Sequence, residues 1–194
     1  MISKLIPIVI VATLSVGCFT QNRKMLIDYQ FSGQENKLID KAIYEWYEGT
    51  GSRDAIIYVF HDAEFAQNFT LRDWFRVDGV ARMYKIRKSD PGYKELVTGV
   101  PPFDGSFVGC SHENTAIVLV EDYFYDPNHI LYSDYFYSVQ LHELGHFFGL
   151  NHTEHGVMCA NKESPTCIDQ IAINRFCNLY STCHNPHSTC KDEK

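Results

Sequence analysis

The pattern of apolar and polar positions along the chain predicts strands and helices in alternation. Residues 24–31 alternate between apolar and polar side chains, as a half-buried strand does. Apolar residues at 34–48 recur at steps of three and four, which predicts an amphipathic helix. Short apolar runs at 55–61 and 116–120 predict central strands, and another strand is expected at about 80–86. This order favours the α+β class, with a mixed sheet and helices packed on it.

Two further segments are less regular. Residues 88–115 are rich in Gly, Pro, Ser and Asp, and we expect a long loop that carries Cys110. Residues 123–137 contain seven Phe and Tyr residues, in clusters at 123–125 and 135–137 and at the single position Tyr132. These rings either pack a long connection over the core or line a substrate cleft, and the pattern allows both.

Length and charge exclude several classes of protein. The 194 residues, 45% hydrophobic and 21% charged, suit one compact globular domain. The formal net charge is -7 and there is no basic run, so nucleic acid is not expected as a partner. No long apolar stretch follows the N-terminus, which excludes a protein with several membrane spans.

The N-terminus has the features of an export signal. Residues 1–17 combine a positive Lys4 with an apolar stretch at 5–16, which is short for a spanning helix. Cys18 follows small residues, so it could become a lipidated first residue of the mature chain, 18–194. A plain cleaved signal is the alternative. We therefore expect an exported monomer that meets a membrane only through a lipid on Cys18.

The cysteines support export. Apart from Cys18, six cysteines remain, and an even number in an exported chain indicates a disulfide framework concentrated after position 158. Six cysteines allow 15 pairings, and the sequence does not choose among them. A structural zinc site with His184 or His187 is the less favoured alternative, because C-x-x-C pairs are missing. The six are Cys110, Cys159, Cys167, Cys177, Cys183 and Cys190.

One short segment carries recognisable chemistry, H-E-L-G-H-F-F-G-L-N-H at 142–152. On a helix, His142 and His146 project from the same face and could hold one cation. Gly149 can end that helix in a left-handed conformation, which lets the chain turn and bring His152 to the same ion. Three histidines leave a fourth position open, as catalytic zinc sites do. Glu143 could then act on a water molecule activated by the metal.

The segment resembles the H-E-x-x-H-x-x-G-x-x-H signature of the metzincin zinc peptidases, and Met158 is placed like the methionine of their Met-turn. The resemblance implies His142, His146 and His152 as ligands of one catalytic Zn²⁺. It implies Glu143 as the general base and acid. It also implies a zincin-like fold with an upper sub-domain at 24–149 and a small Cys-rich lower sub-domain at 150–194.

A weaker resemblance extends over the rest of the chain. The helix at 34–48 and the strand at 55–61 are similar to the opening of matrixin domains. Residues 116–120 resemble the edge strand that binds extended substrate, and 167–177 resemble a C-terminal helix. Thr153 after the third histidine is closer to matrixins, and the cysteines of archaemetzincins have no match. We therefore expect a matrixin-like enzyme.

The function implied is that of a secreted or surface-anchored zinc endopeptidase acting on peptides or proteins. One alternative is a narrow-specificity aminopeptidase. Another is a zinc-containing surface binding protein with little or no catalysis. A calcium site at Asp104-Gly105-Ser106 or Glu121-Asp122 is conceivable, although solvated turn carboxylates are the better interpretation.

Overall fold

The computed structural model describes residues 23–63, 69–76, 78–99, 108–112, 114–160 and 165–191. The predicted signal at 1–17, Cys18 and the candidate calcium ligands Asp104 and Ser106 lie outside the described residues. The division into sub-domains stays a prediction.

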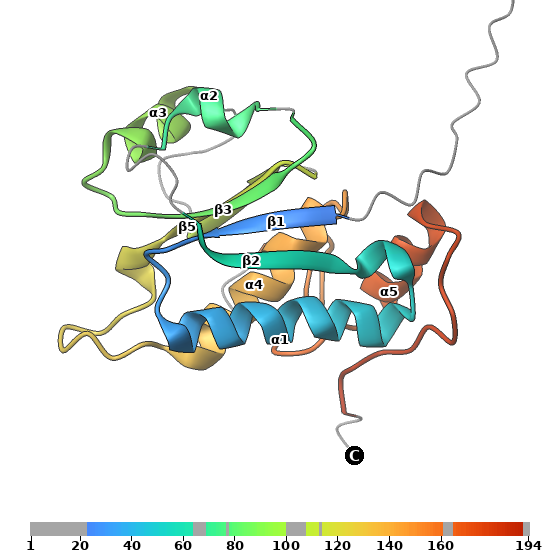
Figure 1. Ribbon diagram of the computed structural model, residues 1–194. Helices are drawn as coiled ribbons and strands as arrows, with labels where there is room; N and C mark the ends of the chain where they lie inside the picture. Colours follow the sequence, from blue (N-terminus) through green and yellow to red (C-terminus); the bar gives the residue numbers. More distant parts are fainter. Residues whose placement is uncertain are drawn as a thin grey trace, which may run out of the picture.

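A five-stranded mixed sheet forms the centre of the molecule (Figure 1). The strand order is β2-β1-β3-β5-β4. The strands β2, β1, β3 and β5 run parallel to one another, and β4 runs antiparallel to β5 at the edge of the sheet. The predicted mixed sheet is thus confirmed. The strands are β1 (Arg23–Asp28), β2 (Ile57–Ala63), β3 (Ala81–Ile86), β4 (Gly109–His112) and β5 (Ala116–Val120).

Helices cover both faces of the sheet (Figure 1). Helices α1, α4 and α5 pack on one face around a large apolar core, whereas α2 and α3 cover the other face over a smaller one. The site described below belongs to the side with the large core. The helices are α1 (Gly33–Thr50), α2 (Leu71–Trp74), α3 (Pro91–Gly99), α4 (Ser133–Phe147) and α5 (Gln170–Leu179).

Helix α1 follows the predicted periodicity and anchors α4. Ser32 and Glu35 form a capping box at its start, and Gly51 in a left-handed conformation ends it. Its buried face includes Trp46, whose indole Nε1–H donates to the carbonyl of Leu141 at 3.0 Å. This bond ties the first long helix to the helix that carries the histidines.

Two expectations about the middle of the chain were wrong. Residues 88–115 are not one loop, because they include α3 and β4. Pro91 opens α3, whose Leu96 is fully buried, and β4 gains its order from the ladder with β5 rather than from an apolar pattern of its own. The run at 116–120 is also not an edge strand. It is β5, buried at every residue between β3 and β4.

The cysteines are paired only in part. Disulfides join Cys167 to Cys190 and Cys177 to Cys183, so the predicted stapling of the C-terminal segment is confirmed for four of the residues. The expectation of a third bond was wrong. Cys110 is a buried thiol on β4 in the smaller core, and Cys159 is a second free thiol.

The aromatic residues at 123–137 mostly serve packing. Phe124, Phe136 and Tyr137 are buried in the large core, and the rings of Phe124 and Phe136 meet edge to face at 5.0 Å. Tyr132 is 48% exposed and lies just before α4. Across the described ranges, none of the helices combines the length and the apolar character that crossing a membrane requires.

Candidate metal centre

Helix α4 carries three of the candidate residues. It is buried along most of its length, with Leu141, Leu144 and Phe147 fully inaccessible to solvent. His142 and His146, one turn apart, are the partly exposed positions of its last turns. The buried helix therefore offers these two imidazoles at the surface on a rigid support.

The chain turns after α4 and returns to the same point. Gly149 has φ 89°, a conformation that few other residues adopt, and its N–H donates to the carbonyl of His146 at 2.8 Å. Leu150 N–H donates to the carbonyl of Gly145 at 3.0 Å. This turn brings His152 back to the helix, as the spacing predicted.

The three histidines converge. The Nε2 atom of His146 lies 3.0 Å from that of His142 and 2.9 Å from that of His152. Among the described residues, these three form the one group of three or more His, Cys, Asp or Glu side chains arranged to hold a metal ion. The spacing suits neighbouring ligands of one small cation.

Hydrogen bonds fix how these rings can act. His142 Nδ1 lies 2.8 Å from the carbonyl oxygen of Val157, and His146 Nδ1 lies 2.7 Å from that of Leu150. A carbonyl only accepts, so each Nδ1 carries the proton and each Nε2 offers a lone pair. Lone pairs that face one another repel, and a shared cation would relieve that repulsion. The donor set therefore fits zinc, which readily accepts imidazole nitrogen.

Burial keeps these imidazoles neutral. Burial, and to a lesser degree the neighbouring His146, lowers the pKa of His142 to about 4. Burial also lowers the pKa of His146 below the ordinary histidine value. At neutral pH both rings are thus uncharged, which is the form that binds a metal.

Met158 is fully buried. It packs against Gly145, where an added Cβ would lie 2.2 Å from the Met158 sulfur. The glycine between the two helical histidines is therefore needed for the close approach of the methionine. Thr153 N–H donates to the carbonyl of Met158 at 2.9 Å and ties this residue to the loop of the third histidine.

Glu143 lies against β4. Its side chain is 4% exposed, and the Ser111 hydroxyl lies 3.0 Å from Glu143 Oε2 and 2.9 Å from the Glu143 carbonyl oxygen. An added Cβ at Gly109 would lie 3.0 Å from Glu143 Cγ, so this strand fits closely around the carboxylate. Burial raises the pKa of Glu143 to about 8, and the Ser111 bond opposes that rise.

The other candidate ligands do not form sites among the described residues. His155 is exposed, and His61 pairs with Asp40. Glu121 pairs with Arg87, and Asp122 accepts from the Lys88 N–H, so the acidic pair at 121–122 is engaged in local contacts. The alternative zinc site with His184 or His187 is excluded because the nearby cysteines are in disulfides.

Sequence reasoning missed the residues that orient the site. Ser111 lies 32 positions from Glu143, and the contacts of Val157 and Leu150 are made through backbone carbonyls. Any residue can offer a backbone carbonyl, so the residue types at 150 and 157 do not reveal these contacts. The contact between β4 and α4 forms only in the folded protein. No local pattern could have identified them.

Comparison with known proteins places the chain in a family. The profile of Peptidase family M54 matches residues 70–184, more than half of the chain. A solved structure, that of archaemetzincin from Methanopyrus kandleri, is similar with a TM-score of 0.56 at 13% sequence identity. The similarity covers 86% of this chain and 99% of that one. Comparison with curated proteins finds no match.

These findings correct the expected subfamily. The matrixin-like assignment was wrong, because the matching family is M54 and the similar structure is an archaemetzincin. Thr153 and the missing cysteines around His152 and Met158 led away from this family, whereas the match over 70–184 does not depend on those few positions. The broader predictions, a metzincin-like peptidase that uses zinc, are confirmed. The chain belongs to Peptidase family M54, a family of zinc metallopeptidases.

Proposed function

We propose that the protein is an exported zinc endopeptidase in which His142, His146 and His152 hold the metal and Glu143 moves the proton. The observation that carries this proposal is the convergence of three Nε2 atoms, together with the Nδ1 contacts of His142 and His146 that leave their Nε2 atoms as acceptors. Three ligands leave an open position, which separates a catalytic site from a closed structural one.

The chemistry follows from the surroundings of Glu143. A zinc ion held by His142, His146 and His152 would supply a Lewis acid that polarises the carbonyl of the scissile peptide bond and lowers the pKa of a bound water molecule. Glu143, buried and held by Ser111, takes the proton of the attacking water and returns it to the leaving amine. Its raised pKa falls when a dication lies nearby, because positive charge favours the carboxylate.

The substrate would lie along β4 rather than along β5. Strand β4 is the edge of the sheet, antiparallel to β5, and it carries Ser111 and Gly109 against Glu143. An extended peptide can add to such an edge through backbone hydrogen bonds. The strand that fixes the proton-transferring carboxylate would then also align the peptide bond beside it.

Export is supported by two observations. Residues 1–17 have the composition of a signal peptide, and the disulfides Cys167–Cys190 and Cys177–Cys183 are typical of oxidising compartments. The mature protein is either secreted after cleavage or anchored through Cys18. Mass spectrometry of the mature N-terminus separates these two products, because lipid adds a defined mass to Cys18.

Two alternatives remain distinct from an endopeptidase. An aminopeptidase would need a free substrate amino group, whereas an endopeptidase would not. A zinc-containing binding protein would need no proton carrier, which makes the seating of Glu143 against Ser111 an argument against it.

The test is hydrolysis of a peptide library with free and with acetylated N-termini. Wild-type residues 19–194, loaded with zinc, should cut both sets internally, and the Glu143→Gln variant should bind zinc but cut neither. Cuts restricted to the first residue of unblocked peptides would instead establish an aminopeptidase. Zinc binding without any cut would favour the binding protein.

A further inference from the structure

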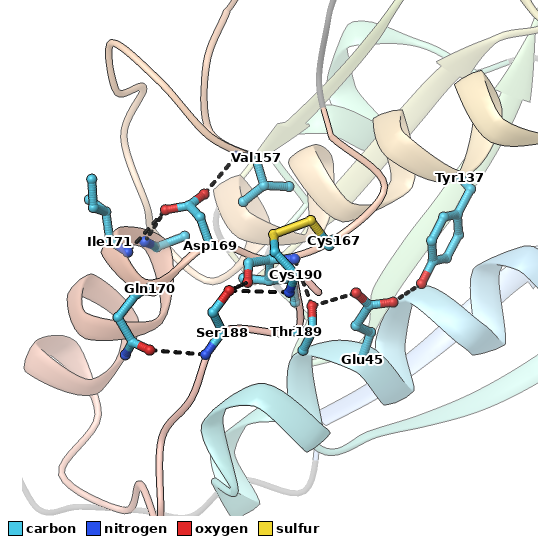
Figure 2. Close-up of a disulfide and its surroundings, with 12 residues drawn as sticks. Glu45, Tyr137, Val157, Cys167, Asp169, Gln170, Ile171, Ser188, Thr189 and Cys190 are labelled. Atoms are coloured by element: carbon cyan, nitrogen blue, oxygen red, sulfur yellow. Dashed lines mark hydrogen bonds between the residues drawn. A yellow bond between two sulfur atoms is a disulfide. The ribbon is translucent and has the colours of Figure 1, made fainter. Parts of the chain in front are cut away.

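Asp169, just before α5, accepts hydrogen bonds from two different parts of the chain. Its Oδ1 accepts from the N–H groups of Ile171 and Ala172 at 3.0 Å each, so it caps α5. Its Oδ2 accepts from the N–H of Val157 at 2.8 Å, across a gap of 12 residues. One carboxylate thus joins the start of α5 to the turn that carries Met158 (Figure 2).

This turn is the one that orients the first histidine. The N–H of Val157 binds Asp169, and the carbonyl of the same residue lies 2.8 Å from His142 Nδ1. Gly156 has φ 82°, and an added Cβ there would lie 2.0 Å from Asp169 Oδ2. The chain at Gly156 is therefore shaped to let the carboxylate reach the turn.

Ile168, the residue before Asp169, is held in place by Thr189. Ile168 N–H donates to Thr189 Oγ1 at 2.7 Å, and Thr189 N–H donates to the carbonyl of Ile168 at 2.9 Å. The Thr189 hydroxyl donates in turn to Glu45 Oε1 at 2.5 Å, and Tyr137 on α4 donates to the other oxygen of Glu45. The disulfide Cys167–Cys190 lies next to these contacts, because Cys167 precedes Ile168 and Cys190 follows Thr189 in the chain (Figure 2).

We propose that Asp169 is a positioning residue for the metal centre: through Val157 it keeps His142 in the Nδ1–H form, with Nε2 aimed at the other two histidines. The inference rests on the proposed function, because it assumes that these histidines bind zinc. Partners of metal-bound histidines typically change metal affinity by about 10–100-fold, and Asp169 acts one bond further away.

The substitution Asp169→Asn separates the two contacts. Asparagine is as good a helix cap as aspartate, so its single carbonyl oxygen can still accept from Ile171 and Ala172. Its amide NH₂ group then faces the Val157 N–H, and because both groups are donors, no hydrogen bond forms between them. Ser32→Ala is a matched control, since it removes a side-chain cap from α1, away from the histidines.

Two measurements other than hydrolysis test the positioning role of Asp169. The first is zinc affinity, measured by competition with a chromophoric chelator. The second is the tautomer of His142 in the metal-free protein, read from its ring ¹⁵N chemical shifts. We expect Asp169→Asn to weaken zinc binding about 10-fold, to populate both tautomers, and to lower the melting temperature by about as much as Ser32→Ala does. Ser32→Ala should lower the melting temperature and leave zinc affinity within about twofold of wild type.

The proposal is overturned if folded Asp169→Asn binds zinc as tightly as wild type and keeps the Nδ1–H tautomer. If that variant does not fold, the wild-type spectrum still decides, because a dominant Nε2–H tautomer of His142 contradicts the proposed role. Failure of the proposed function looks different: wild type would then bind no zinc, or would bind zinc and hydrolyse nothing, whatever the residue at 169.

Discussion

Two neighbouring regions contribute to the metal centre in different ways. In residues 142–158 the histidines converge through contacts of four to six positions, His142 with His146 and His146 with His152. In residues 165–191 the decisive contacts are long-range: Asp169 reaches Val157 across 12 positions, and Thr189 reaches Glu45 across 144. The first region supplies the donor atoms and the two carbonyls that orient His142 and His146, and the second region holds Val157, which carries one of those carbonyls.

This difference separates chemistry from positioning. A helix turn and one glycine suffice to bring three imidazoles together, whereas the His142 ring is bonded to the carbonyl of Val157, whose N–H donates to Asp169. Damage to the first region should remove the metal. Damage to the second should weaken the site and the fold together, by smaller amounts.

The largest effect should come from the donors. His146→Ala removes the central ligand, whose Nε2 lies within 3.0 Å of both others, and should weaken zinc binding about 10²–10³-fold and abolish hydrolysis. Chelator competition measures the affinity. His155→Ala is the control, because that exposed residue lies outside the cluster. Equal losses in both variants would contradict the assignment of ligands.

Removing the disulfide that encloses Asp169 comes next. Cys167→Ser with Cys190→Ser opens a bond between residues 23 positions apart, and the chain-entropy argument predicts about 3 kcal/mol less unfolding free energy. The bond Cys177–Cys183 spans 6 positions, so its removal should cost about 2 kcal/mol. Urea denaturation compares the two variants. Zinc affinity should fall only in the first, and an equal fall in both would remove the link between this disulfide and the site.

The packing of Met158 offers a smaller perturbation. Gly145→Ala places a Cβ 2.2 Å from the Met158 sulfur in a fully buried position, and overpacking of this kind costs about 1–3 kcal/mol. Gly33→Ala is the matched control, because nothing lies within 4 Å of a Cβ built there. Thermal unfolding should distinguish the two. A neutral Gly145→Ala would show that Met158 is free to move away.

The smallest effect is the pH dependence of the metal-free protein. The pKa values of His142 and His146 are lowered by burial, so the unfolded chain binds more protons below about pH 6.5 and stability falls as pH falls. The pKa of Glu143 is raised to about 8, so its contribution is present at low pH and is lost as pH rises towards 8. Below about pH 6.5 the two histidines oppose Glu143, whereas above it Glu143 acts alone. Stability should therefore peak near pH 6.5, fall by about 1 kcal/mol per pH unit on the alkaline side, and fall with a shallower slope on the acid side.

Urea denaturation at several pH values in the presence of a chelator measures this profile. Glu143→Gln should flatten the alkaline side and steepen the acid side, because the buried carboxyl then no longer opposes the two histidines between about pH 4.5 and pH 6.5. A profile that is flat between pH 5 and pH 8 in wild type would contradict the burial of these three groups.

Much of the fold could be predicted because it rests on local pattern. The strand at 116–120 matches β5 at both ends, and the helix at 34–48 lies within α1. In contrast, α2, α3 and β4 were missed. Strand β4 has four residues with no apolar alternation, and only its ladder with β5 gives it order. Elements that depend on a partner do not show in their own sequence.

The candidate site divides in the same way. The spacing of His142, His146 and His152 is a property of one short segment, so the sequence could indicate it. The roles of Ser111 and Asp169 depend on where β4 and α5 pack. The two disulfides leave Cys110 and Cys159 free, an arrangement that is not among the 15 complete pairings of six cysteines. Tertiary packing determines these contacts and disulfide pairs, and residue type alone does not reveal them.

X-ray absorption spectroscopy at the zinc edge tests the central claim most directly. We predict one zinc per chain with three imidazole nitrogens at about 2.0–2.1 Å and no sulfur ligand. Loss of one imidazole in His152→Ala should follow. Sulfur at about 2.3 Å would contradict the account, because it would place the metal on a free cysteine thiolate, that of Cys110 or Cys159, rather than on the three histidines.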